Sequence, residues 1–342
     1  MKVYKISGEI LSPVHIGTGQ DWSPMDYYIN KDEQTLVHFS FDSLVSKMTG
    51  DEKNKIMKLM DDNELVELRK VIKEIAEKKS NGFFDPIKVV PEITQIYSDN
   101  LGNIENQLLI QPFIRTNQGN TPYIPGSSLK GAVRTAVISI LAGKKNLQKP
   151  KPFEYKKFES RVLGYHNAKQ DPFRALKFSD AVLSPHSTFI CKTYNAGKDK
   201  NGNLVTNNIQ IINEVTRSFT SQSTIEGQAL FESELRIDDA LVNLKGVSVS
   251  IGKNKIISSC NEFYRDKLEL EHEKFYASSG ISAVSEALLN FSLDDNECLI
   301  RIGRYSGVES VTLDDYRDPK TPRDKGWGNT RNLAHGQYPM GW

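Results

Sequence analysis

Residues 115–136, RTNQGNTPYIPGSSLKGAVRTA, hold the most informative pattern of this sequence. Pro125–Gly126 predicts a turn, because proline fixes φ and glycine accepts backbone conformations that other residues avoid. The residues that follow predict a helix that is capped by Ser127 or Ser128 and ended by Gly143. The pattern therefore places a serine- and glycine-rich loop at the N-terminus of a helix.

That loop, residues 126–131, has the chemistry of a phosphate-binding site. Free backbone N–H groups and the positive end of a helix dipole are suited to an anion. Lys130 and Arg134 lie four residues apart, so both cations share one helix face. The loop is not a Walker motif, since Ala132 stands where that motif needs lysine. The alternative is a capped helix with two exposed basic residues.

The composition is that of a globular protein with room for a large core. The 342 residues suffice for about two domains. A hydrophobic share of 38% and a charged share of 25% argue against a disordered chain. Lys+Arg 44 against Asp+Glu 43 gives a net charge of +1, which excludes a histone-like basic coat. A local basic groove stays open, because nucleic-acid binding depends on where charge lies.

The cysteines and the N-terminus bear on the compartment. Cys191, Cys260 and Cys298 lie far apart and form no CxxC pair, which argues against a disulfide framework and a thiolate zinc site. The N-terminal residues alternate like a strand and lack the pattern of a signal peptide. No apolar run approaches the roughly 20 residues of a membrane span. We expect a cytoplasmic protein without membrane contact.

Hydrophobic periodicity predicts an α+β fold with mainly antiparallel sheets. Residues 41–80 repeat apolar side chains at helical spacing, with breaks near Thr49–Gly50 and Asp61–Asp62. They predict two or three amphipathic helices inserted between strands. Strands are predicted at 3–11, 26–30, 35–39, 175–183, 188–194, 208–215, 228–237 and 298–303, with further helices at 155–164, 261–277 and 281–290.

No pattern in the sequence demands an enzyme. The motifs GxSxG and HExxH are absent, and the paired aspartates lack the flanking pattern of a metal loop. His15 follows the first strand in a turn with Gly17 and Gly19, where it could stack on or hydrogen-bond a nucleotide. A purely structural histidine is the alternative at this position. The other histidines are scattered along the chain.

A second basic cluster lies near the C-terminus. Arg301 precedes a turn between two glycines, and this turn holds Arg304 and Tyr305. Arg323 follows in a loop-rich stretch. Arginines beside glycines and an aromatic ring are typical of a surface that binds phosphates and bases. A solvated, loop-rich tail is the alternative.

Four motifs together resemble the RAMP superfamily of CRISPR-Cas proteins. They are residues 13–19, PVHIGTG; 123–134, YIPGSSLKGAVR; 303–307, GRYSG; and 339–342, PMGW. Their order and the chain length most resemble the Csm-type subunits that cap the 3′ side of the crRNA in type III-A effector complexes. Members of that family often continue a few residues past the Gly–Trp pair, so we expect the last strand here to be incomplete.

The resemblance implies two ferredoxin-like (RRM-like) domains, at residues 1–185 with the helical insertion around 41–80, and at 186–342 with the loop-rich tail. It implies a crRNA-binding subunit that is not an enzyme, needs no cofactor or metal, and supports crRNA maturation in antiviral defence. Implied partners are crRNA, the backbone and small subunits, target RNA near the 3′ side of the guide, and host nucleases. The implied RNA-binding residues are His15, Gly126, Ser127, Ser128, Lys130, Gly131, Arg134, Arg301, Arg304 and Arg323.

Two other functions stay open within the same family. A metal-independent endoribonuclease would process precursor crRNA with His15 and Lys130 as its candidate residues. A backbone subunit would cut target RNA with a loop aspartate and Mg²⁺. The length of the chain and its C-terminal motifs argue against the backbone subunit.

Overall fold

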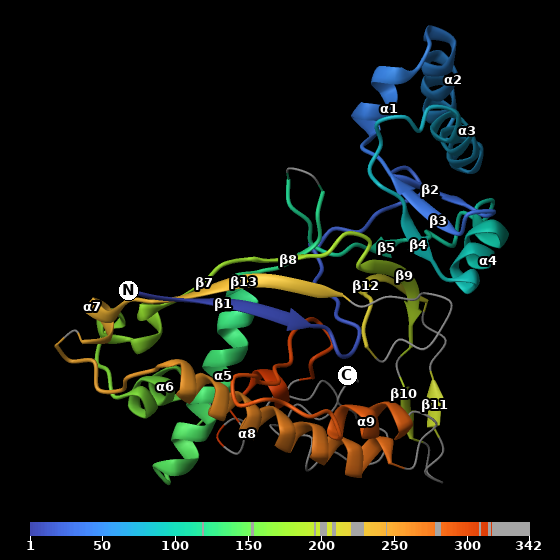
Figure 1. Ribbon diagram of the computed structural model, residues 1–342. Helices are drawn as coiled ribbons and strands as arrows, with labels where there is room; N and C mark the ends of the chain where they lie inside the picture. The colour runs from blue at the N-terminus through green and yellow to red at the C-terminus, as the bar shows by residue number, and fades with distance from the viewer. Residues whose placement is uncertain are drawn as a thin grey trace.

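Helices, two large β-sheets and a separate two-stranded sheet are the regular elements in the part of the chain that the computed structural model describes (Figure 1). The described residues are 1–117, 120–151, 154–194, 196–198, 204–206, 210–219, 229–243, 245–277, 282–307, 309–313 and 316. The predicted α+β class with mainly antiparallel pairing is confirmed, and one of the two large sheets is mixed. None of the described helices is long and apolar enough to cross a membrane.

The first sheet is antiparallel and joins the N-terminal strand to a strand from the second half of the chain. Its strands are β1 (Lys2–Glu9), β13 (Leu230–Ile237), β8 (Ala181–Leu183) and β6 (Tyr123–Ile124), with β7 (Leu176–Phe178) also paired to β13. β1 and β13 pair along their whole length. Gly8 lies under the ring of Phe231, where an added β-carbon would come within 2.0 Å of the ring. The position of the Phe231 ring over β1 therefore requires a glycine.

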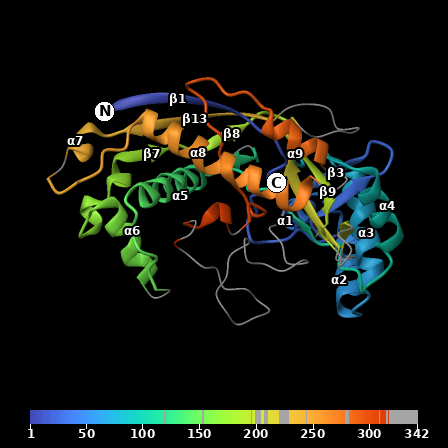
Figure 2. The same ribbon diagram turned by 90° about the horizontal axis from the view of Figure 1, so that it is seen from below.

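Two long helices cover one face of the first sheet. α5 (Gly126–Lys144) and α8 (Lys253–Glu271) cross beneath β1 and β13 (Figures 1 and 2). Tyr264 is fully buried between them and donates a hydrogen bond of 3.1 Å to the carbonyl of Ala132. Further helices around this body are α6 (Tyr155–Leu163), α7 (Asp239–Val242) and α9 (Ser282–Leu289).

The second sheet has the order β2–β3–β4–β9–β12–β5. Its strands are β2 (Tyr27–Asn30), β3 (Thr35–His38), β4 (Ile87–Val89), β9 (Thr188–Thr193), β12 (Ile211–Thr216) and β5 (Ile110–Gln111). The β4–β9 and β12–β5 pairs are parallel and the other pairs are antiparallel. α4 (Pro91–Asn100) packs against this sheet, and β10 (Ala196–Lys198) pairs separately with β11 (Leu204–Thr206).

The predicted helical insertion is confirmed. It consists of α1 (Phe41–Lys47), α2 (Gly50–Asp61) and α3 (Leu65–Lys78), which lie at one end of the molecule (Figure 1). Thr49 and Glu52 form a capping box at the start of α2, where the sequence predicted a break. Apolar residues of α3 pack against β2 and β3, and this packing buries the predicted apolar stripe.

Three expectations differ from the structure. Residues 298–303 are not in a strand, so the prediction of a strand there is wrong. α8 begins at Lys253, earlier than the predicted residue 261, because the apolar positions of its first turns also face the core. Both sheets take strands from each side of residue 185, so a boundary at 185/186 does not separate them.

Candidate nucleic-acid interface

The turn that follows β1 meets the glycine-bracketed turn near residue 304. The Arg304 N–H donates a hydrogen bond of 2.8 Å to the carbonyl of His15. Gly303 has φ +98°, and an added β-carbon would lie 2.8 Å from the same carbonyl oxygen. Only glycine tolerates both the positive φ and the close approach. Two of the motifs singled out in the sequence, almost 300 residues apart, therefore form one contact.

His15 is held as a neutral ring. Its side chain is 2% exposed, and Nδ1 lies 2.7 Å from the carbonyl oxygen of Glu214. Because a carbonyl can only accept, Nδ1 carries the proton and Nε2 presents a lone pair. Burial lowers the pKa of His15, and the charge of Arg304 adds to this, against the opposing effect of the Glu214 hydrogen bond. Among the described residues, Nε2 has no hydrogen-bond partner.

A cavity of about 280 Å³ opens at this contact. Its lining residues come from the turn after β1, from the end of β5 with the residue that follows it, and from the turn at Gly303. They are His15, Gly17, Thr18, Gly19, Gln20, Asp21, Gln111, Pro112 and Arg304. Arg304 is exposed, and its guanidinium donates a hydrogen bond to the side-chain oxygen of Gln111. The central carbon of the guanidinium lies 5.9 Å from the ring centre of Tyr305. The cavity thus combines a cation, a neutral imidazole and peptide groups of a glycine-rich turn.

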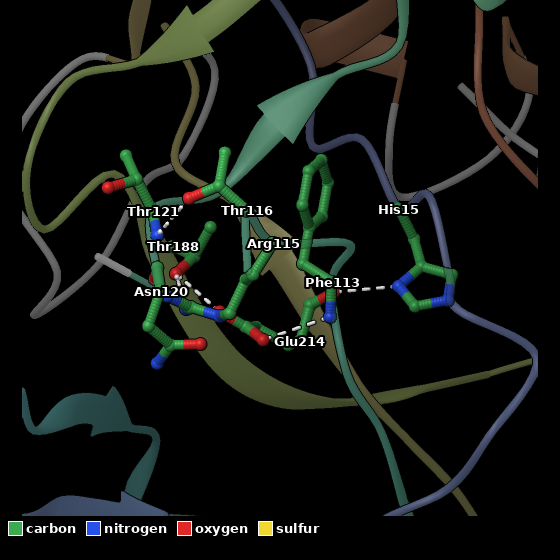
Figure 3. A network of polar contacts seen from close by, with 8 residues as sticks. All are labelled: His15, Phe113, Arg115, Thr116, Asn120, Thr121, Thr188 and Glu214. Carbon is green, nitrogen blue, oxygen red and sulfur yellow. Dashed lines mark hydrogen bonds and ion pairs between the residues drawn. The ribbon is translucent and has the colours of Figure 1, made fainter. Parts of the chain in front are cut away.

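A buried carboxylate fixes the wall behind His15. Glu214 of β12 is fully buried and forms an ion pair with Arg115 (Figure 3). It also accepts hydrogen bonds from the Thr188 hydroxyl, at 2.6 Å, and from the Phe113 N–H, at 2.9 Å. The backbone carbonyl of the same residue holds His15. Because this buried charge has several partners, the network keeps β12 and residues 113–115 in one arrangement.

The middle motif takes a different place from the one expected. α5 begins at Gly126 with Pro125 as its N-cap, so the prediction of a Ser127 or Ser128 cap is wrong. The Gly126 N–H donates a hydrogen bond of 2.8 Å to the carboxylate of Asp180. An added β-carbon at Gly126 would lie 2.3 Å from the carbonyl oxygen of Phe178. The tight turn therefore serves the docking of α5 onto the first sheet, and a carboxylate already occupies its first N–H.

The two cations of that motif have intramolecular partners. Lys130 donates a hydrogen bond of 2.8 Å to the carbonyl of Leu176, and burial lowers the pKa of its amine. Arg134 pairs with Glu159 at 3.0 Å and with Asp171 at 2.9 Å. RNA contact by Lys130 and Arg134 stays a prediction, and it would require them to leave these partners. Ser127 and Gly131 are exposed on the first turns of the helix, and Ser128 is half-buried.

The C-terminal arginines also separate. Arg301 is 5% exposed and pairs with the equally buried Glu271 of α8 at 2.7 Å. Of the predicted site residues, only His15 and Arg304 are found together in the cavity of about 280 Å³. Arg323 and the Pro339–Trp342 motif lie outside the described residues.

Sequence analysis missed the residues that complete the cavity and its wall. Gln111, Asp21, Arg115 and Glu214 carry no motif. One signal was present, because Glu214 stands in an apolar strand pattern where a charge needs a partner. Its partner, Arg115, lies 99 residues away in the chain and could not be identified from spacing.

Curated relatives match part of the chain. One is the CRISPR system Cms protein Csm5 of Methanocaldococcus jannaschii, 34% identical over 140 residues, which are 39% of this chain and 30% of that protein. Another is the protein of the same name from Streptococcus thermophilus, 27% identical over 154 residues, which are 40% of this chain and 38% of that protein. The matching segments therefore span well under two thirds of either relative.

Solved structures share the fold over most of the chain. A chain in the cryo-EM structure of a Csm–crRNA–target RNA ternary complex of a type III-A CRISPR-Cas system superposes with a TM-score of 0.63 at 20% identity, covering 90% of this chain and 86% of that one. The crystal structure of T. onnurineus Csm5 gives a TM-score of 0.55 at 21% identity, covering 87% and 89%.

The family model of the RAMP superfamily matches residues 8–305. The match takes in the His15 turn and the Arg304 turn, which line the cavity, and the α5 segment, which packs on the first sheet. This chain therefore belongs to the RAMP superfamily.

Proposed function

We propose that this chain is a crRNA-binding subunit of a type III-A Csm complex and that it caps the 3′ side of the crRNA. Membership of the RAMP superfamily, the Csm5 name of two relatives and the fold shared with a chain of a Csm–crRNA–target RNA complex support the assignment. In this proposal the two sheets, each with its helices, correspond to two ferredoxin-like domains. The subunit binds RNA without cutting it and contributes to crRNA maturation.

The cavity between His15 and Arg304 is the observation that carries RNA binding. Arg304 supplies a cation at an exposed position, where a phosphate can replace or join its contact to Gln111. The Nε2 lone pair of neutral His15 has no partner among the described residues but is buried, so it can accept a hydrogen bond from a ribose 2′-hydroxyl only if the turn at Gly17 shifts. These contacts read the RNA backbone and not its sequence, as suits a guide whose spacer varies.

The endoribonuclease alternative has less support. That activity would use His15 together with Lys130, but Lys130 does not line the cavity and its amine is bound to the Leu176 carbonyl. General acid–base catalysis requires the two groups to reach the same reacting atoms. Incubating the chain with repeat RNA in EDTA separates the two functions, because only the endoribonuclease produces cuts within the repeat.

Arg304→Ala tests the RNA contact. We expect weaker crRNA binding. We also expect the slope of log K against log [salt] to fall in magnitude by about one unit, because one phosphate contact is lost. Arg236→Ala is the matched control, since Arg236 is exposed on the open face of β13 and, within the described part of the chain, forms an ion pair only with Glu234. Equal affinity and slope for Arg304→Ala and the wild type would contradict the proposed contact.

Reconstitution tests the capping role. Effector complexes assembled without this chain should carry fewer backbone subunits or lose crRNA of mature length, as measured by native mass spectrometry and RNA gels. Complexes with unchanged stoichiometry and crRNA length would reject capping, whatever the RNA affinity of the isolated chain.

A further inference from the structure

Two of the three cysteines, far apart in the sequence, lie against each other. Cys260 is fully buried on α8, and Cys298 is half-buried in the segment that leads to the Arg304 turn. Both belong to the core between the first sheet and its helices. Each thiol is the largest influence on the pKa of the other. The third cysteine, Cys191, lies on β9 of the other sheet.

One asparagine side chain holds the two cysteines in this arrangement. Asn261, next to Cys260 in the helix, donates a hydrogen bond of 3.0 Å to the carbonyl of Glu297 and accepts one of 2.9 Å from the N–H of Leu299. These bonds bracket Cys298 on both sides. The backbone around Cys298 is therefore fixed to the helix turn that carries Cys260, which keeps the two residues side by side in the core.

The two thiols differ in access and in acidity. The interaction with Cys260 lowers the pKa of Cys298, and the same interaction together with burial raises the pKa of Cys260. Cys298 lines a cavity of about 880 Å³ beside β1, which gives a small reagent a route to its sulfur. Cys298 thus has the properties of an attacking thiol, and Cys260 those of a buried resolving thiol.

We propose that Cys260 and Cys298 are a reversible disulfide site that reacts with low-molecular-weight disulfides such as glutathione disulfide. The Cys298 thiolate attacks one sulfur of the small disulfide, forms a mixed disulfide and releases one small thiolate. Cys260 then loses its proton to solvent and attacks the sulfur of Cys298, which releases the second small thiol. The two cysteines are oxidised by two electrons, and the small disulfide is reduced to two thiols.

The disulfide would tie α8 to the segment before the Arg304 turn. Arg301 in this segment already pairs with Glu271 at the end of α8, so the covalent bond adds to an existing contact. The oxidised form should therefore exchange the amide hydrogens of residues 297–304 more slowly. This inference concerns the thiols alone and does not depend on the proposed RNA function.

The test uses the full native chain and glutathione disulfide at neutral pH. We expect free thiols to fall from three to one, the intact mass to fall by about 2 Da, and non-reducing peptide mapping to join the peptides of Cys260 and Cys298. Dithiothreitol should restore all three thiols. Cys260→Ser should stop at a stable glutathione adduct on Cys298, and Cys191→Ser should behave as the wild type.

Other outcomes would overturn the proposal. They are a wild-type chain that keeps three free thiols, a lasting glutathione adduct without the internal disulfide, or a disulfide that includes Cys191. The thiol count, the mass and the peptide map are all measured on the folded wild-type protein. They therefore decide the question even where a cysteine variant fails to fold. RNA affinity is measured in parallel and is not part of the criterion.

Discussion

One buried carboxylate joins β12 to β9 and to residues 113–115. Glu214 is charged, fully buried and bound by an arginine, a hydroxyl and a backbone N–H. A buried charge is tolerated when all its partners are present and becomes costly when one is removed. The stability of the wall behind His15 therefore depends on this one carboxylate.

Glu214→Gln should destabilise the protein, because it leaves the Arg115 guanidinium largely buried without its counter-charge. We expect a loss of about 3–5 kcal/mol in the free energy of unfolding, measured by urea denaturation. The control is Glu232→Gln, whose pair with Lys5 is two-thirds exposed on both sides, and its effect should stay below about 1 kcal/mol. Similar effects of the two variants would show that the buried network carries no special weight.

His38 lies between two aromatic rings. Its ring centre is 4.1 Å from that of Trp22 and 5.3 Å from that of Phe84, and both pairs are stacked. Burial lowers the pKa of His38 to about 4. Because the folded-state pKa lies below the ordinary value of 6.5, the unfolded chain binds the proton first as the pH falls. The stability from this residue is therefore present above pH 6.5 and is lost between pH 6.5 and 4.

His38→Phe should flatten that dependence, since phenylalanine keeps the stack and cannot titrate. Unfolding free energies at several pH values between 6.5 and 4 should fall less steeply for the variant than for the wild type. Parallel curves for the two proteins would mean that His38 titrates alike in the folded and unfolded states.

At the scale of elements, α5 contains two glycines of one motif, and the packing of the helix requires only one of them. Gly126 starts the helix against the backbone of Phe178, and Gly131, one turn later, has no atom within 4 Å of an added β-carbon. The two positions belong to the same motif but meet different surroundings. They form a matched pair for substitution.

Gly126→Ala should cost about 1–3 kcal/mol of stability, because its β-carbon overlaps a backbone oxygen that cannot move aside. Gly131→Ala should stabilise the chain by up to about 1 kcal/mol, since alanine favours the helix and meets open space. Thermal unfolding of both variants checks the pair. A stable Gly126→Ala protein would mean that α5 can lift from the sheet without loss.

Much of the element pattern could be predicted from the sequence. The alternation over residues 3–11 and the helical spacing over 41–80 became β1 and the three inserted helices, because each element has a clear polar and a clear apolar side. Residues 298–303 are also rich in apolar side chains but pair with no strand. Whether such residues form a strand depends on the distance to a neighbouring strand, which periodicity does not encode.

At the scale of the whole molecule, the candidate site exists because the two ends of the matched region meet. Gly303→Ala should separate them, since its β-carbon would approach the His15 carbonyl to 2.8 Å at a φ that disfavours alanine. We expect weaker RNA binding with no change in net charge, measured by titration against crRNA. Gly143→Ala on α5, whose β-carbon would meet open space, serves as the control and should bind as the wild type. Unchanged affinity of Gly303→Ala would place RNA contact elsewhere.

The sequence alone determined the class of elements, the helical insertion and the family, because periodicity, turn residues and short motifs are local properties of the chain. Only the tertiary structure decided which basic side chains are exposed and which are bound by carboxylates or carbonyl groups of the chain. Lys130, Arg134 and Arg301 have carbonyl or carboxylate partners supplied by distant segments, whereas Arg304 stays exposed beside His15. A cation is available to RNA when folding leaves it exposed and does not bind it to a carboxylate or a buried carbonyl, and that depends on contacts across the whole chain.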